Sequence, residues 1–306
     1  MPYYLGLDGG GSKTTCVVGD AATILATAVS GPSNITRVGE ARARESLQQA
    51  VRQACAGAKI DPAQLQRSCI GAAGTGREEI ANAVREIVAE VIPGKISVVG
   101  DMQIALQAAF GAAPGIMVIA GTGSIAYGRD AEGKAARAGG WGFAISDEGS
   151  AHWIGRMAVA SILQQVDELG GKRIARPASE LFKEISSVWR VGSAEELARV
   201  ANQSADFAEL LPAVVSAADA GDKLAEQVLT QAGRELAQLA DIVLLKLFPE
   251  HSPSTRLALA GGVFRYAHRT RESFCEEIRA AHPHLDLNSE IVEPVHGALQ
   301  LARDSV

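Results

Sequence analysis

Residues 5–15 read LGLDGGGSKTT, and residues 116–126 read IMVIAGTGSIA. Each segment is an apolar run, a glycine turn with hydroxyl side chains and a second apolar run, which predicts a strand, a tight turn and a strand. Glycine at the tip of a turn lets the backbone adopt positive φ and approach a ligand closely, and successive N–H groups in such a turn form an anion-binding concavity. Two such hairpins favour a duplicated fold that holds a nucleotide between its halves.

Two other phosphate-binding motifs fit these segments less well. A Walker loop needs a lysine after its second glycine and then a helix, whereas Ser12 follows Gly11 and the β-branched residues beyond predict a strand. Residues 121–126 match the Rossmann glycine pattern, but hairpin-turn residues follow at 127–133 where that fold needs a helix. One glycine hairpin alone would be ordinary structure; two with matching chemistry favour phosphate binding.

The composition indicates a globular protein. Of the 306 residues, 47% are hydrophobic and 21% are charged, and the length suits two domains. The net charge of -6 argues against nucleic acid as a main partner, because phosphate neutralisation needs a basic patch. No signal peptide opens the sequence and no apolar run approaches the length of a membrane span, so no membrane partner and a cytoplasmic location are expected.

The cysteines are scattered and form no CxxC pair. They are Cys16, Cys55, Cys69 and Cys275. Without a histidine at metal-site spacing they are expected to be buried thiols in a reducing compartment, not ligands of zinc or of an iron–sulfur cluster. The histidines of the segment HPH at 282–284 are expected in a solvated loop.

Hydrophobic periodicity predicts the order of secondary structure. Three strands are expected within residues 3–30, followed by helices and strands in alternation up to residue 110. Strands resume at residue 117, helical sequence fills most of residues 150–248, and an edge strand is expected at 286–291. This pattern predicts an α/β fold.

The turn-rich sequence at residues 112–115 is the expected domain boundary. We predict an N-terminal domain of residues 1–113 and a C-terminal domain of residues 114–293 with a helical insertion. The last helix, residues 294–306, is expected to pack back on the N-terminal domain.

Five short motifs follow one another along the chain: DGGGSKT at 8–14, GTGS at 121–124, GGWG at 139–142, SDEGSAHWI at 146–154 and GGV at 261–263. The first, second and last resemble the two phosphate motifs and the adenosine motif of the actin/hexokinase/Hsp70 ATPase superfamily. The other two are similar to the N-acetylglucosamine kinase and glucosamine kinase branch, in a family that also includes activators of 2-hydroxyacyl-CoA dehydratases. The resemblance covers nearly the whole chain. It implies two ribonuclease-H-like domains with a nucleotide cleft between them.

The resemblance also implies an ATP site and a magnesium site. The residues expected to bind ATP are Gly10, Gly11, Ser12, Lys13, Thr14, Thr122, Gly123, Gly261 and Gly262. Asp8 would help to hold Mg²⁺ through water, which suits a hard cation that keeps its hydration. Without the resemblance, Asp8 is a turn residue, and Lys13 and Thr14 are residues of an exposed hairpin.

Asp101 is the expected catalytic base. It follows a predicted strand at residues 95–99 and precedes a predicted helix at 102–110, so its ordinary role is a helix N-cap. A carboxylate at that end of a strand also faces the cleft of an α/β sheet. In kinases of the resembling family the matching aspartate accepts the proton of the attacking sugar hydroxyl, and the rest of phosphoryl transfer is positioning and charge stabilisation.

The residues expected to bind the sugar are Asn34, Asp101, Gly140, Trp141, Asp147 and Ala151. Asn34 is by itself a routine turn residue, and the resemblance makes it a ligand of sugar hydroxyls. Asp147 would accept hydrogen bonds from those hydroxyls. Trp141 is either a stacking platform for the sugar or a core aromatic, and a packing role that shapes the glycine loop is favoured.

These observations predict an ATP-dependent kinase that phosphorylates N-acetylglucosamine at the 6-hydroxyl, with Mg²⁺ as cofactor and glucosamine as the alternative substrate. An activator of a 2-hydroxyacyl-CoA dehydratase is less favoured, because it needs interface cysteines for a [4Fe–4S] cluster. A sugar-sensing regulator is a third class, and such regulators usually carry a DNA-binding domain. A homodimer is left open.

Overall fold

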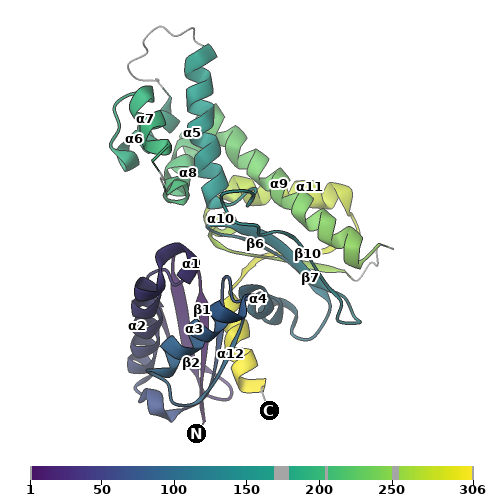
Figure 1. Ribbon diagram of the computed structural model, residues 1–306. Helices are drawn as coiled ribbons and strands as arrows, with labels where there is room; N and C mark the ends of the chain where they lie inside the picture. Colours follow the sequence, from purple (N-terminus) through teal and green to yellow (C-terminus); the bar gives the residue numbers. More distant parts are fainter. Residues whose placement is uncertain (1, 169–178, 204–205, 250–254, 305–306) are drawn as a thin grey trace. The chain divides into compact units, whose positions relative to one another are not determined.

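The computed structural model describes residues 2–168, 179–203, 206–249 and 255–304. The chain divides into two compact units: unit 1 is Met1–Met117 with Val292–Val306, and unit 2 is Val118–Ile291. Each unit contains a five-stranded sheet with helices packed against it (Figure 1). The expected α/β fold is confirmed.

The sheet of unit 1 has the strand order β3-β2-β1-β4-β5. Its strands are β1 (Tyr3–Gly9), β2 (Thr14–Gly19), β3 (Ile24–Ser30), β4 (Leu65–Ala72) and β5 (Lys95–Gly100). β1 is antiparallel to β2 and parallel to β4, so that Asp8 pairs with Thr15 on one side and with Gly71 on the other. β5 is parallel to β4. The carboxyl ends of β1, β4 and β5 therefore share one edge of the sheet, which is where α/β proteins bind ligands.

Helices cover both faces of this sheet (Figure 1). The helices of unit 1 are α1 (Ile35–Val38), α2 (Glu40–Ala58), the 3-10 helix η1 (Pro62–Gln64), α3 (Glu78–Ala89), α4 (Asp101–Phe110) and α12 (Pro294–Asp304). Because side chains alternate along a strand, Leu5 and Leu7 enter a core with α2 and α3, while Tyr4 enters a second core with α4 and α12. Gly6 lets α12 lie directly on β1, since a Cβ at Gly6 would be 2.4 Å from the backbone nitrogen of Leu299.

The sheet of unit 2 has the strand order β10-β9-β6-β7-β8. Its strands are β6 (Gly115–Ala120), β7 (Ser124–Arg129), β8 (Ala135–Gly139), β9 (Arg256–Ala260) and β10 (Asp286–Val292). β7 and β8 form the antiparallel hairpin that excludes the Rossmann interpretation. β10 lies at the edge of the sheet, as predicted for residues 286–291.

Helices make up most of the rest of unit 2. They are α5 (Ala151–Glu168), α6 (Glu180–Trp189), α7 (Ala194–Ala201), the 3-10 helix η2 (Phe207–Leu210), α8 (Leu211–Asp219), α9 (Lys223–Leu247), α10 (Gly262–Tyr266) and α11 (His268–Ala281). α9 packs on β7 and β8, and α11 runs beside α9 (Figure 1). None of the helices in the described ranges has the length and apolar character needed to cross a membrane.

Candidate functional site

The turn between β1 and β2 is tied to the loop that follows β3. The Gly10 N–H donates to the Lys13 carbonyl (3.0 Å) inside the turn, and the Ser33 N–H donates to the Gly10 carbonyl (3.1 Å). The Thr14 hydroxyl lies 2.8 Å from the Gly31 carbonyl oxygen and 2.7 Å from the Ser33 hydroxyl. These bonds fix the backbone of the turn that was predicted to receive phosphate.

The predicted ATP-binding residues of this turn differ in exposure. Ser12 and Lys13 are exposed at the tip, and Gly10 and Gly11 are partly buried. Thr14 is fully buried, so its hydroxyl holds the turn in place instead of facing solvent.

Two predicted site residues, Asp8 and Asp101, lie at the carboxyl edge of the sheet, where the charge of Asp101 acts on Asp8. Burial, followed by the charge of Asp101, raises the pKa of Asp8 from 3.8 to about 7, with Lys13 lowering it and Glu293 raising it further. Burial also raises the pKa of Asp101, against the hydrogen bond that its Oδ1 accepts from the Met102 N–H (2.9 Å). The edge therefore carries an excess of negative charge.

Asp101 is not the N-cap of α4. The cap is Gly100, and Asp101 is the first residue of the helix. A carboxylate in the first turn is favoured by the helix dipole, so the local sequence places Asp101 there whatever its chemistry.

The residues present fit a hard divalent cation. Within the described ranges, no group of three or more His, Cys, Asp or Glu side chains is arranged to hold a metal by itself. Magnesium is usually bound by one or two carboxylates together with water and substrate phosphates. Asp8 and Asp101 are carboxylates in surroundings that favour a cation, beside a turn rich in backbone N–H groups.

Asn34 caps the short helix α1. Its Oδ1 accepts hydrogen bonds from the Thr36 N–H (3.1 Å) and from the Thr36 hydroxyl (2.7 Å). The side-chain oxygen of Asn34 thus serves as the helix cap. The side-chain amide nitrogen is the group that can donate to a ligand.

Thr75 is a residue near the carboxyl edge that the sequence did not single out. Its hydroxyl lies 2.7 Å from the Ala72 carbonyl oxygen and 2.9 Å from the Val99 carbonyl oxygen, so it joins the ends of β4 and β5 just before Asp101. Gly74 and Gly76 flank Thr75 in the sequence and mark a loop at the end of a strand. This is the sequence feature that could have pointed to Thr75.

The turn between β6 and β7 is docked on the start of α5. The Gly121 N–H donates to the Gly123 carbonyl (2.9 Å) across the turn. The Ala151 N–H donates to the Gly121 carbonyl (2.8 Å), and the His152 N–H donates to the Thr122 carbonyl (3.4 Å). Ala151, predicted to contact the sugar, therefore uses its N–H to hold the predicted phosphate turn.

Asp147 joins this turn to the GGWG loop. Its side chain is buried, and its carboxylate accepts hydrogen bonds from the Ser124 and Gly142 backbone N–H groups. Burial raises the pKa of Asp147, and those two hydrogen bonds oppose the rise. Asp147 also has a left-handed backbone, with φ 73°. Its observed contacts are with backbone, and its role as a sugar ligand stays a prediction.

The GGWG loop is bent by glycines with positive φ: Gly139 (72°), Gly140 (70°) and Gly142 (98°). Gly140 packs tightly, because a Cβ there would lie 2.7 Å from Cδ1 of Ile125. Trp141 leaves the same loop with 66% of its surface exposed. The interpretation of Trp141 as a core aromatic is therefore wrong.

The predicted adenosine motif lies beside the second phosphate turn. β9 and β6 are neighbours in the sheet. Gly261, at φ 103°, approaches β6 so closely that a Cβ would be 2.2 Å from the Ala120 carbonyl oxygen. Ala120 precedes Gly121, so Gly261 and Gly262 adjoin the turn in unit 2.

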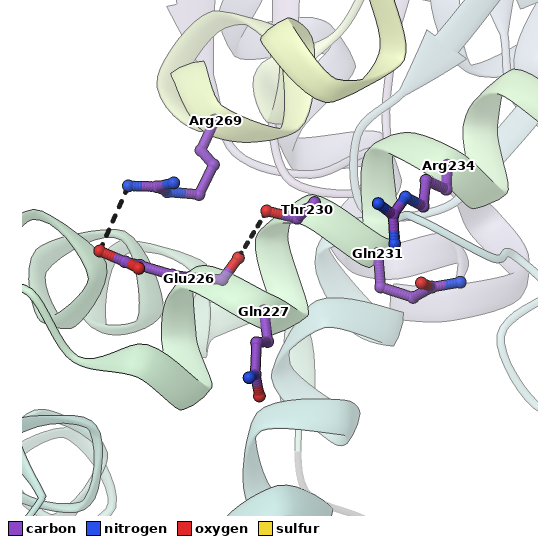
Figure 2. Close-up of a pocket in the computed structure, with 6 residues that line it drawn as sticks. All are labelled: Glu226, Gln227, Thr230, Gln231, Arg234 and Arg269. Atoms are coloured by element: carbon purple, nitrogen blue, oxygen red, sulfur yellow. Dashed lines mark hydrogen bonds and ion pairs between the residues drawn. The ribbon is translucent and has the colours of Figure 1, made fainter. Parts of the chain in front are cut away.

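A separate hollow of about 470 Å³ lies on α9 and α11. Figure 2 shows its polar lining, in which Arg269 pairs with Glu226 (3.4 Å) and the Thr230 hydroxyl donates to the Glu226 carbonyl (2.8 Å). None of the predicted site residues lines it. It is a charged surface hollow in which Arg234 pairs with Glu277 and Gln231 with Glu235, both outside the lining.

Over residues 5–302, the chain matches the sequence model of the BadF/BadG/BcrA/BcrD ATPase family. It is 32% identical over 309 residues to a protein of Clostridium acetobutylicum named N-acetylmuramic acid/N-acetylglucosamine kinase, covering 99% of each chain. It is 27% identical over 318 residues to the N-acetyl-D-glucosamine kinase of Dictyostelium discoideum, covering 99% of this chain and 98% of the relative.

Among solved structures, a proposed N-acetylglucosamine kinase from Chromobacterium violaceum has a similar fold. The TM-score is 0.77 at 26% sequence identity, and the match covers 99% of both chains.

Proposed function

Since the chain belongs to the BadF/BadG/BcrA/BcrD ATPase family, we propose that it is an ATP-dependent amino-sugar kinase that phosphorylates N-acetylglucosamine at the 6-hydroxyl. The similarity to N-acetylglucosamine kinases over the full length of the chain supports this activity. The structural observation that carries it is the pair Asp8 and Asp101 at the carboxyl edge of unit 1, next to a glycine turn.

Asp101 acts as the general base in this proposal. The O6–Pγ bond forms while the bond from Pγ to the bridging oxygen breaks, the hydroxyl proton passes to a carboxylate oxygen of Asp101, and ADP leaves. The raised pKa of Asp101 makes its carboxylate a stronger proton acceptor than an exposed aspartate. Its place at the start of α4 fixes the direction from which it meets the hydroxyl.

Asp8 is the proposed magnesium ligand, acting through water. When bound, the cation neutralises charge on the transferred phosphoryl group and orients the phosphates. Asp8 lies on β1, which is paired on both sides, so its backbone is fixed at the carboxyl edge of the sheet. Asp8, whose pKa is raised by burial and by the charge of Asp101, would be favoured in its ionised form by a cation held beside it.

Glycine turns supply the proposed nucleotide contacts. In unit 1 the turn residues are Gly10, Gly11, Ser12 and Lys13. Thr14 stabilises this turn through the contacts of its hydroxyl with Gly31 and Ser33. In unit 2 the turn residues are Thr122 and Gly123, beside Gly261 and Gly262 of the adenosine motif. Backbone N–H groups in such turns bind phosphate without a side chain.

The sugar contacts of the proposal are the Asn34 amide, the Trp141 ring and the loop backbone at Gly140. Asp147 and Ala151 are linked to these residues by hydrogen bonds: Asp147 to the β6–β7 turn and the GGWG loop, and Ala151 to the β6–β7 turn. We propose the N-acetylated sugar over free glucosamine, which is supported by the names of the full-length relatives.

A coupled assay of ADP release tests the proposal directly. We expect turnover with N-acetylglucosamine that exceeds turnover with glucosamine and glucose, and a phosphorus NMR spectrum that identifies the 6-phosphate. Faster turnover with glucosamine than with N-acetylglucosamine would identify glucosamine as the substrate and keep the protein an amino-sugar kinase. No ADP release with any amino sugar would contradict the kinase proposal.

The dehydratase-activator alternative makes a different prediction about the cysteines. Cys16, Cys55, Cys69 and Cys275 are all buried. Burial raises the pKa of each thiol, which disfavours the thiolates that bind a cluster. The protein purified without oxygen should be colourless and free of iron; visible absorption that is lost on oxidation would favour the activator instead.

We also propose that the protein acts in the cytoplasm. A reducing compartment with ATP keeps buried thiols unpaired and supplies the phosphoryl donor.

A further inference from the structure

The loop after β8 exposes large apolar side chains on a tightly held backbone. Trp141 is 66% exposed, Phe143 54% and Ile145 84%. Exposed apolar groups gathered in one segment mark a binding surface more often than single ones do. The loop is anchored beneath Trp141, since a Cβ at Gly139 would be 3.0 Å from Leu239 of α9.

Arg137, which the sequence did not single out, holds this loop from β8. Its Nη1 donates to the Gly139 carbonyl (3.0 Å) and lies 3.4 Å from the Gly140 carbonyl oxygen. Its guanidinium carbon lies over the Trp141 ring, 4.2 Å from the ring centroid. A planar guanidinium can stack on an aromatic face while its edge donates hydrogen bonds, which an ammonium cannot do.

The backbone of Arg137 is fixed as well. β8 pairs it with Tyr127 of β7, and its carbonyl accepts a hydrogen bond from Nζ of Lys246 (3.2 Å) on α9. The guanidinium thus extends from a rigid strand to a glycine loop that has little stiffness of its own. One face of the Trp141 ring is covered by Arg137, and most of the indole stays open to solvent.

The open indole belongs to the candidate site of unit 2. Gly142, the next residue, donates its N–H to the Asp147 carboxylate, which also accepts the Ser124 N–H of the phosphate turn. The loop that carries Trp141 is thus joined through Asp147 to the predicted phosphate turn, and an open aromatic face suits a ligand with one apolar face and a rim of hydroxyls. A pyranose ring has these properties, because its axial C–H groups form an apolar face while its hydroxyls lie at the rim.

We propose that Arg137 is a positioning residue that holds Trp141 as the stacking platform for the sugar ring. This inference rests on the proposed kinase function and adds how the sugar is bound. Arg137 acts through Trp141 and the glycine loop and does not touch the reacting atoms.

The test is a double-mutant cycle with Arg137→Ala, Trp141→Ala and the double variant. Lys134→Ala is the matched control, because it removes one exposed positive charge from the same hairpin. For Arg137→Ala we expect the KM for N-acetylglucosamine to rise about fivefold or more, with kcat and the KM for ATP changed less than about twofold. Trp141→Ala should raise the sugar KM about tenfold. Lys134→Ala should change none of these values.

The coupling between the two residues decides the inference. If Arg137 acts by placing Trp141, then Arg137→Ala should change the sugar KM less than about twofold in the Trp141→Ala background. Calorimetric titration of N-acetylglucosamine without ATP should reproduce the pattern in Kd. Effects that multiply in the double variant, or a rise in the KM for ATP instead of the sugar, would overturn the role of Arg137. Absence of sugar phosphorylation by the unaltered protein would instead overturn the proposed function.

Discussion

The carboxylate of Asp147 lies against Gly123, so that a Cβ added at Gly123 would be 2.8 Å from Oδ2 of Asp147. This carboxylate is held by the N–H groups of Ser124 and Gly142 and cannot withdraw without giving up those bonds. The predicted phosphate turn therefore needs glycine at 123 for a reason of packing, in addition to any approach of phosphate to the backbone.

Gly123→Ala should lower the free energy of unfolding by about 1–3 kcal/mol, because the new methyl group displaces the carboxylate. Gly121→Ala is the control, since a Cβ at Gly121 meets no atom within 4 Å in the same turn. Thermal unfolding of the two variants without nucleotide measures the difference. Equal losses of stability in both would show that the Asp147 contact does not constrain the turn.

Strands and turns that are marked by residues next to one another in the sequence were predictable. β3 (Ile24–Ser30) is the last of the three strands expected within residues 3–30, because β-branched and apolar residues stand between turn residues at both ends. The hairpin β1–β2 was separable from a Walker loop by the β-branched residues that follow its turn. The glycine turns were visible because clustered glycines mark turns, but the positive φ expected at their tips is not found at Gly10, Gly121 or Gly123.

The directions of individual side chains were not predictable. Trp141 follows a left-handed glycine, which turns the ring outward, and nothing in the local composition distinguishes this from burial. His282, expected in a solvated loop, is buried, with its Nε2 2.8 Å from Oδ1 of Asp241 on α9. That partner is 41 residues away in the chain, so only the packed fold brings the two together.

The same limit applies to the candidate site. Asp8 and Asp101 stood out because each occurs at the end of an apolar strand. The effect of Asp101 on the pKa of Asp8 depends on β1, β4 and β5 ending at one edge. The role of Arg137 depends on the path of a loop that three positive-φ glycines determine, and a single arginine in a strand carries no such signal.

Asp101→Asn should reduce kcat by about 10²–10⁴-fold, because the variant cannot accept the hydroxyl proton. The fold should be kept, since an asparagine Oδ1 can accept the same hydrogen bond from the Met102 N–H. Steady-state kinetics, with the melting temperature as a control for folding, check this. A kcat close to that of the unaltered protein would remove Asp101 from the role of base.

Asn34→Asp should raise the KM for N-acetylglucosamine roughly tenfold while leaving α1 capped. The substitution keeps an oxygen for the Thr36 N–H and removes the amide donor that we assign to the sugar. Thr36→Val is the control, because it removes the hydroxyl that lies 2.7 Å from Asn34 Oδ1 and leaves the amide. An equal rise in KM for both variants would mean that Asn34 serves only the cap.

Asp8→Asn should stabilise the nucleotide-free protein at pH 8 and have little effect at pH 4. Burial and the neighbouring acids raise the pKa of Asp8 from 3.8 to about 7 in the folded state. Well below pH 3.8 the group is protonated in both folded and unfolded chains, so it costs no stability, and at pH 4 the cost is still small. As the pH rises towards 7, the unfolded chain loses this proton first, and stability falls by up to about 4 kcal/mol before levelling off.

Asparagine has no proton to lose, so this fall should be absent from the variant. Thermal unfolding of the two proteins between pH 4 and 8 measures it, with Glu86→Gln, an exposed change of equal charge on α3, as the control. Magnesium with ADP should stabilise the unaltered protein more than Asp8→Asn, because a cation near Asp8 offsets the repulsion that asparagine never has. Parallel pH profiles for both proteins would show that Asp8 is not held at a raised pKa, and with that the argument for a cation beside it would fail.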